Sequence, residues 1–344
     1  MPDSKTVFVL GAGASFEFGL PVGETLKEMI SKLLRFTFDY NSLKTGDPLI
    51  YNAITLAARE AGIRDANSWF AAGRSIAEAM PLSLSIDNFL HIQKGKDHIE
   101  QCGKLAIVRS ILSAEGRSKL RINTNQKLRF DDCAETWAVR LVKLIAEQCS
   151  LQELDARLSK LTFIVFNYDR CVEHFLMHAL GVTYGISPDE AAALVNKIKI
   201  YHPYGTVGNL PWMKNSDVRA IDFGEEPQAG HLLQLSSGIK TFTEGTDDAD
   251  SDILAIRASV ADADRFVFLG YAYHPLNMRI LLGDLPTSRR TRRVFGTAFG
   301  MSKYDSDDIR DALDAVLHAP SAIIRNDVTC YSIFHEHSRA LSFT

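Results

Sequence analysis

The sequence has few cysteines, no long hydrophobic run and no large excess of charge of either sign. Its five cysteines include no Cys-x-x-Cys pair, which disfavours a zinc ribbon and a dithiol redox site. No stretch approaches the roughly 18 consecutive apolar residues of a membrane span. The apolar run at 7–10 stops at a glycine and has no cationic region before it. We therefore expect neither a signal peptide nor a membrane segment, and we expect a cytoplasmic location.

The charge and composition exclude further classes of protein. The 344 residues carry 38 basic and 42 acidic side chains, which gives a formal net charge of −4. This balance offers no electrostatic reason to bind nucleic acid, so direct nucleic-acid binding is not expected. A hydrophobic content of 46% with 23% charged residues indicates a globular chain, long enough for one large α/β domain or two domains.

The chain begins with a short strand that runs into a glycine turn. Residues 6–10 are apolar or β-branched, as in a parallel strand buried on both faces. The turn that follows is Gly11-Ala12-Gly13-Ala14-Ser15. Backbone amides at such a turn can hold a phosphate near a helix N-terminus, although a tight turn without a ligand has the same pattern. Phe16 takes the place of the third glycine in the usual dinucleotide fingerprint, which disfavours an ordinary dehydrogenase.

Strand signals nearly vanish over the next 120 residues or so. Apolar spacing there predicts helices at roughly 51–62, 65–79, 86–94, 104–115 and 131–150. We interpret residues 39–159 as a helical module inserted after the first strand–helix unit. Ser85 is the expected N-cap of the third of these helices. Asp87 either supports the same helix start or reaches a ligand, and both readings stay open.

Two further strands end in polar residues. Residues 161–166 predict a buried strand that leads directly into Asn167-Tyr168-Asp169, and residues 197–201 predict a strand that ends at His202. Parallel strands end at one edge of a sheet, so these side chains can converge with the glycine turn on one ligand. The structural alternatives are a turn-forming amide for Asn167, a helix N-cap for Asp169 and a packed ring for His202.

The last third of the chain returns to strand–helix alternation. It predicts strands at 265–269, 294–298 and 328–334, with helices at 275–282 and 306–318. The first of these strands ends at Gly270-Tyr271. The fold class that follows is α/β, a Rossmann-like parallel sheet flanked by helices. Residues 1–38 and 160–344 would form this sheet domain, with the helical module between them.

Four motifs in this order resemble the sirtuin superfamily. Within it, the likeness is closer to the sirtuin-like NAD-hydrolase domains of bacterial antiphage defence proteins. The motifs are the glycine turn with Gly19-Leu20-Pro21, then Asn167-Tyr168-Asp169, then His202 with Gly205, and finally Phe268-Leu269-Gly270-Tyr271. The resemblance covers both ends of the chain and hardly touches the helical module.

The resemblance implies NAD as the substrate and a role for each motif. Asn167 would orient the nicotinamide ribose or the attacking water, Asp169 would support that end of the pocket, and His202 would be the general base. The implied binding residues for NAD, of which the first four would hold the pyrophosphate, are Gly11, Ala12, Gly13, Ser15, Pro21, Gly270 and Tyr271.

Departures from the family pattern point to water as the acceptor. Deacetylating sirtuins carry four zinc-binding cysteines in paired spacing, whereas this chain has no such pairs, and no metal is expected. Pro21 leads into Val22-Gly23-Glu24 and not into the acidic-phenylalanine-arginine run of those enzymes. The expected activity is hydrolysis of NAD to nicotinamide and ADP-ribose. Nicotinamide is a good leaving group because its departure neutralises the pyridinium, so the protein mainly has to orient and stabilise the ribose.

Two alternatives stay open. The chain could be a non-catalytic module that senses NAD or ADP-ribose, which would need the phosphate cradle but not Asn167 and His202. It could also transfer ADP-ribose or remove acyl groups, which would need a groove for a protein substrate. The resemblance further implies a homo-oligomer or a partner protein of a defence system, and antiviral action by NAD depletion.

Overall fold

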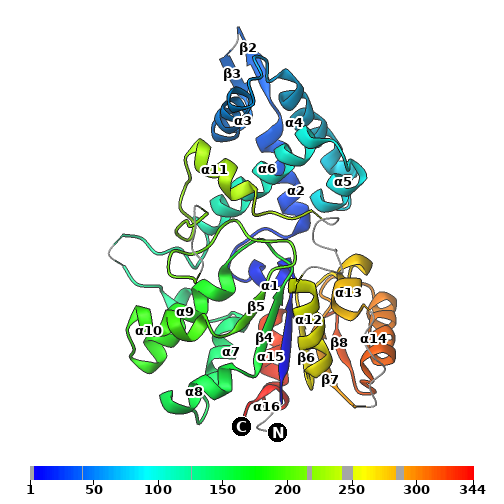
Figure 1. Cartoon of the computed structure of the whole chain (residues 1–344). Coiled ribbons are helices and arrows are strands. Elements are labelled where there is room, and N and C mark those ends of the chain that lie inside the picture. Colours follow the sequence, from blue (N-terminus) through cyan, green and yellow to red (C-terminus); the bar gives the residue numbers. More distant parts are fainter. Residues whose placement is uncertain (1–3, 41, 125, 215–218, 242–250, 284–289) are drawn as a thin grey trace.

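The computed structural model describes residues 4–40, 42–124, 126–214, 219–241, 251–283 and 290–344. Its centre is a six-stranded parallel sheet flanked by helices (Figure 1). The predicted Rossmann-like α/β fold is therefore confirmed. The strands are β1 (Thr6–Leu10), β4 (Leu161–Val165), β5 (Lys199–Tyr201), β6 (Arg265–Leu269), β7 (Arg293–Thr297) and β8 (Ile323–Arg325).

The strand order is that of doubly wound dinucleotide-binding sheets. β1 lies in the middle, β4 and β5 extend the sheet to one side, and β6, β7 and β8 extend it to the other. The switch point, where ligands bind in such sheets, lies between β1 and β6. Leu10 is in register with Val165 and with Leu269, so β1, β4 and β6 end at the same level. The residues that follow these three strands consequently share one edge of the sheet.

Two helical layers cover the sheet because its central strands are apolar on both faces. Val7 and Val9 belong to one hydrophobic core, and Phe8 and Leu10 belong to the other. The first core includes α12 (Ser251–Asp262), α13 (Pro275–Leu282) and α14 (Lys303–Leu317). The second includes α7 (Trp137–Ala146), α8 (Leu151–Leu158), α9 (Cys171–Tyr184), α10 (Pro188–Val195), α15 (Cys330–Glu336) and α16 (Ser338–Leu341).

A helical module lies over the edge at which β1 ends (Figure 1). It contains α2 (Gly23–Leu34), α3 (Pro48–Glu60), α4 (Asn67–Ala79), α5 (Ile86–Ile92), α6 (Asp97–Glu115) and α11 (Ala229–Ser236). α2 packs on α4 and α6, and α11 packs on α3 and α6. α2 and α11 therefore belong to the module by packing, although they lie outside residues 39–159. α7 and α8 lie inside that interval but pack against the sheet domain.

The expected strand at 328–334 is wrong. The sixth strand is β8, and residues 330–336 form α15. Thr329 caps this helix, since its hydroxyl accepts a hydrogen bond from the Ser332 amide at 3.2 Å. The buried residues Cys330, Ile333 and Phe334 follow helical spacing, three and four positions apart.

The middle of the chain differs from expectation in two places. The single helix expected at 131–150 is a short 3-10 turn (Phe130–Cys133) followed by α7, and the next helix, α8, begins only at Leu151. The break is set by Ser150 and Glu153, which form a capping box and start α8. A small antiparallel hairpin, β2 (Thr37–Asp39) and β3 (Ser42–Thr45), was not expected. Its short strands are mostly exposed and lack the apolar alternation on which strand prediction depends.

Candidate functional site

The glycine turn is bound to the end of β6. The short helix α1 (Ala12–Phe16) begins directly after Gly11. The Gly11 amide donates to the Leu269 carbonyl, and the Gly13 amide donates to the Gly270 carbonyl, both at 3.0 Å. The Ala14 amide donates to the Gly11 carbonyl at 2.9 Å. Two of the residues expected to hold the pyrophosphate, Gly11 and Gly13, therefore already have partners for their amides within the protein.

The glycines of this turn allow two backbones to touch. A Cβ added to Gly11 would lie 2.4 Å from the Gly270 oxygen, and one added to Gly13 would lie 2.7 Å from the Gly270 Cα. A Cβ on Gly270 would lie 2.2 Å from the Gly13 carbonyl carbon, and its φ of +54° is left-handed. The close contact between the ends of β1 and β6 thus explains why all three positions are glycine, without any ligand.

Ser15 and Asn167 meet across the ends of β1 and β4. The Asn167 side-chain amide donates to the Ser15 hydroxyl at 2.9 Å. Ser15 is buried, whereas Asn167 is half-buried. These two residues were predicted to share a site, and they lie 152 positions apart in the chain. Asn167 thus has its donor end fixed while part of its side chain remains accessible.

His202 is held on both sides. Its Nδ1 lies 3.2 Å from the Asn167 carbonyl oxygen, and its Nε2 lies 2.7 Å from Glu173 Oε1. Burial alone would lower the pKa of His202, but the Glu173 carboxylate and the Asn167 carbonyl outweigh it, so the pKa is raised. A carbonyl and an ionised carboxylate only accept hydrogen bonds, so both ring nitrogens donate. In this arrangement both ring nitrogens face acceptors, so neither has a free lone pair for a general base.

Glu173 is a site residue that the sequence interpretation missed. It lies in the first turn of α9 and is 2% exposed. Its second carboxylate oxygen is buried and has no hydrogen-bond partner among the described residues. An acidic residue in the first turn of a helix is ordinarily explained by the helix dipole, so the spacing alone gave no signal for this role.

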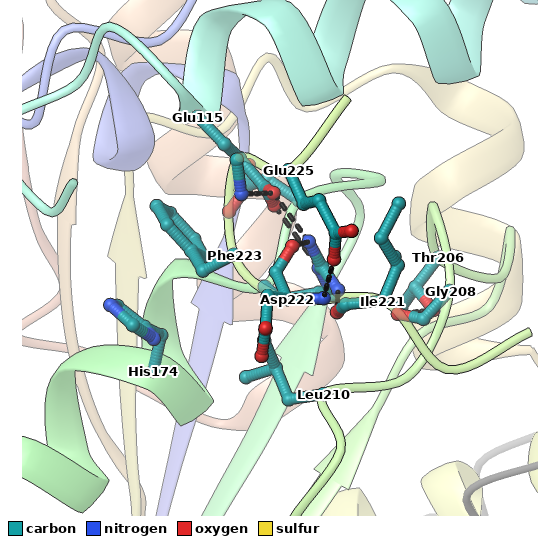
Figure 2. A network of polar contacts seen from close by, with 12 residues as sticks. Glu115, His174, Thr206, Gly208, Leu210, Ile221, Asp222, Phe223 and Glu225 are labelled. Carbon is teal, nitrogen blue, oxygen red and sulfur yellow. Dashed lines mark hydrogen bonds and ion pairs between the residues drawn. The ribbon is translucent and has the colours of Figure 1, made fainter. Parts of the chain in front are cut away.

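Asp169 and Arg170 belong to the frame behind the site. Asp169 is buried and accepts a hydrogen bond from the Cys171 amide at 3.1 Å, but the N-cap of α9 is Arg170, so the N-cap alternative for Asp169 is wrong by one residue. Arg170, also missed, forms a fully buried ion pair with Glu115 at 2.5 Å. Figure 2 shows Glu115 beside Ile221 and Asp222, whose carbonyls accept from Arg170 at 2.7 and 3.3 Å. Burial raises the pKa of Glu115, and Arg170 opposes that rise.

The remaining expected residues lie at different depths around the same edge. Ala12 is half-buried in α1, and Pro21 is half-buried in the loop before α2. Tyr271 is 3% exposed, and its hydroxyl is buried without a hydrogen-bond partner in the part of the chain that the structure describes. Tyr271 packs on Phe166, with ring centroids 5.2 Å apart. Pro21 belongs to none of the contacts that join the other site residues.

Asp87 reaches this edge from the helical module. Ser85 is the N-cap of α5, as predicted, and accepts from the Asn88 amide at 3.0 Å. The Asp87 carboxylate instead accepts a hydrogen bond from the Tyr168 hydroxyl. The helix start therefore has its own cap, and Asp87 is left to join α5 to the segment after β4.

Two comparisons with known proteins find no match for this chain. No protein-family model matches it, and no curated protein matches it. Helices long and apolar enough to cross a membrane are absent from the described ranges. Within those ranges, no group of three or more His, Cys, Asp or Glu side chains is placed to hold a metal ion.

Proposed function

We propose that the chain binds NAD over the carboxyl ends of β1, β4 and β6 and hydrolyses it to nicotinamide and ADP-ribose. The observation that carries the proposal is the meeting of Ser15, Asn167 and His202 at this edge of the sheet. The strand order supports it, because sheets of this order bind dinucleotides at the switch point between β1 and β6. The antiviral role and a defence partner remain inferences from the family resemblance.

In the proposed reaction the bond between the nicotinamide nitrogen and the ribose C1 breaks. The electron pair moves to the ring nitrogen, which neutralises the pyridinium, and a water oxygen bonds to C1 and releases a proton. Asn167 is our candidate for orienting the ribose or the water, because Ser15 fixes its side-chain amide and the residue is only half-buried. His202 fixes the Asn167 backbone, and it could act as the base only after the Glu173 contact opens.

In this proposal the glycine turn does not hold the pyrophosphate in the way that the sequence suggested. The amides of Gly11, Gly13 and Ala14 are bonded internally, so they would contribute packing and local dipoles but no direct bond to the pyrophosphate in this conformation. In the proposed complex the close contact between the ends of β1 and β6 would instead lie beneath the bound dinucleotide. The internal bonding of these amides does not involve Asn167. Its side chain bonds to the Ser15 hydroxyl, and its backbone carbonyl faces His202.

The experiment is release of nicotinamide from NAD without any acylated peptide. We expect wild-type protein to release it, and we expect Asn167→Ala and His202→Ala each to lower kcat by at least about 100-fold. Asn123→Ala is a matched control, because Asn123 is exposed and its side chain bonds locally to Gln126. Release that depends on an acyl-lysine peptide would contradict hydrolysis, and normal turnover by a folded Asn167→Ala variant would remove Asn167 from the mechanism.

Both ring nitrogens of His202 are engaged in hydrogen bonds within the protein. This favours a second candidate, a module that senses NAD or ADP-ribose without cleaving it. Such a protein would gain thermal stability from NAD and release no nicotinamide, because binding to the native state alone raises the melting temperature. The same incubation, followed by a melting curve, separates the two candidates.

A further inference from the structure

Asp87 is an acid of the helical module that lies beside aromatic residues of the sheet domain. Its carboxylate accepts from the Tyr168 hydroxyl, and Tyr168 directly follows Asn167. The Asn167 side chain bonds to Ser15 of the first β–α turn, whereas the next side chain bonds to the module. Two consecutive residues after β4 thus bond in different directions, Asn167 toward the glycine turn and Tyr168 toward Asp87.

The surroundings of Asp87 are aromatic. Tyr168 and Tyr204 are 5% and 4% exposed. Burial raises the pKa of the Tyr204 hydroxyl, and the nearby Asp87 charge raises it further. Phe166 packs against Tyr204 and Tyr271, with centroids 5.9 and 5.2 Å apart. The carboxylate thus borders a block of rings, whose faces carry partial negative charge and attract cations.

No arginine or lysine pairs with Asp87 among its interactions in the described ranges. The titratable groups that face it are Tyr168, Tyr204 and His274, the N-cap residue of α13. Burial raises the pKa of Asp87, while Tyr168 and His274 lower it, and burial prevails. A partly desolvated carboxylate without a strong cation is costly, and a positively charged ligand would offset that cost.

A second observation comes from the Tyr271 hydroxyl. It is buried, and no partner for it exists in the described part of the chain. Burial first, and then the neighbouring Tyr204 and Tyr273, raise the pKa of this hydroxyl, so it stays a donor at neutral pH. Buried polar atoms are rarely left without a partner, and this one lies in the same aromatic block.

From this arrangement we infer that Asp87 faces the positively charged nicotinamide ring of bound NAD and selects oxidised over reduced dinucleotide. The inference rests on the proposed function, because it assumes that a nicotinamide dinucleotide occupies this edge. NAD carries a cationic pyridinium ring, whereas the dihydronicotinamide ring of NADH is neutral. When ionised, Asp87 attracts only the oxidised ring, and the Tyr271 hydroxyl offers a donor to the carboxamide that both forms share. The helical module is then part of the binding site.

The test measures the dissociation constants of NAD and NADH by titration calorimetry. Wild-type protein and the Asn167→Ala variant, in which cleavage is expected to be slow, serve as the backgrounds. We expect NAD to bind more tightly than NADH, and Asp87→Asn to reduce this preference by about tenfold, with little change for NADH, since one charge interaction near a protein surface is lost. Asp97→Asn is the matched control, because Asp97 also lies in the first turn of a module helix but is exposed.

The possible results distinguish failure of the Asp87 inference from failure of the proposed function. If the background binds both dinucleotides and Asp87→Asn leaves their ratio unchanged, the Asp87 inference is wrong and the proposed function stands. If Asp87→Asn weakens NAD and NADH equally, or lowers the melting temperature well below that of Asp97→Asn, Asp87 has only a structural role. If neither dinucleotide binds to wild-type protein, the proposed function and the inference both fail.

Discussion

Asn167 and Arg170 lie three positions apart after β4, and they differ in how completely their polar atoms are paired. All three guanidinium nitrogens of Arg170 donate within the protein, and its side chain is fully buried. Around Asn167, by contrast, the polar groups are less completely paired. Asn167 is half-buried, and one oxygen of Glu173 has no partner among the described residues.

This difference separates framework from candidate site within one short segment. A fully paired buried network fixes one conformation and offers nothing to a ligand. Polar atoms left unpaired at a strand edge are costly unless something else binds them. The segment after β4 thus anchors the chain to α6 through Arg170, and under the proposed function it offers Asn167 to the ligand.

The largest expected effect comes from breaking the framework. Arg170→Met removes the cation that neutralises buried Glu115, so we expect a loss of about 3–5 kcal/mol in unfolding free energy. Arg129→Met is the control, because Arg129 pairs with Asp132 at the surface, and we expect less than about 1 kcal/mol there. Urea unfolding measures both. Equal losses in the two variants would show that the buried pair is not a special anchor.

A smaller loss is expected at the glycine contact between β1 and β6. Gly270→Ala places a Cβ against the Gly13 backbone at a left-handed φ, so we expect a loss of about 1–3 kcal/mol. Gly23→Ala is the matched control, since a Cβ there meets nothing within 4 Å, and its stability should equal or slightly exceed that of wild type. Melting curves without ligand check the pair.

The same contact changes the meaning of a bulky substitution in the turn. Gly13→Val would clash with Gly270, so a loss of NAD binding in that variant would report on folding before it reported on a phosphate site. Only a Gly13 variant that melts like wild type can test the phosphate role. If such a variant still gains full stabilisation from NAD, the cradle has to be sought elsewhere.

The smallest expected effect is the pH dependence at His202. Its folded pKa is raised above 6.5, so its contribution to stability is full below pH 6.5 and is lost as pH rises through the folded value. Burial lowers the pKa of His174 to about 3. His174 therefore changes the unfolding free energy only below pH 6.5, because above about pH 7 it is neutral in both the folded and the unfolded state. Unfolding free energies measured upward from about pH 7 should therefore fall in wild type and stay flatter in Glu173→Gln. Parallel slopes would contradict the His202–Glu173 pairing.

The sequence predicted most of the fold because buried parallel strands are continuous apolar runs. It failed at residues 323–336, where β8 is only three residues long and the apolar residues of α15 have the composition of a strand. The packing of α2 and α11 into the module was also out of reach, because the helical pattern gives a buried face but not the partner of that face.

The candidate site was predictable at the strand ends and not beyond them. Topology brings Ser15, Asn167 and His202 to one edge, so strand assignment was enough to place them together. Glu173 and Arg170 could not be assigned, because their roles depend on His202 and Glu115, which tertiary packing brings to them from 29 and 55 positions away. The glycine turn was found, but its contact with Gly270 gives it a reason that the sequence could not reveal.

The most direct test of NAD hydrolysis by this protein is to follow the reaction in water enriched in oxygen-18. We expect nicotinamide and ADP-ribose in equal amounts, with one heavy oxygen at the ribose carbon that carried nicotinamide, and we expect the folded Asn167→Ala variant to form both products at least about 100-fold more slowly. Nicotinamide release with the ADP-ribose attached to protein or peptide, or the same heavy-oxygen product from Asn167→Ala at the wild-type rate, would contradict it.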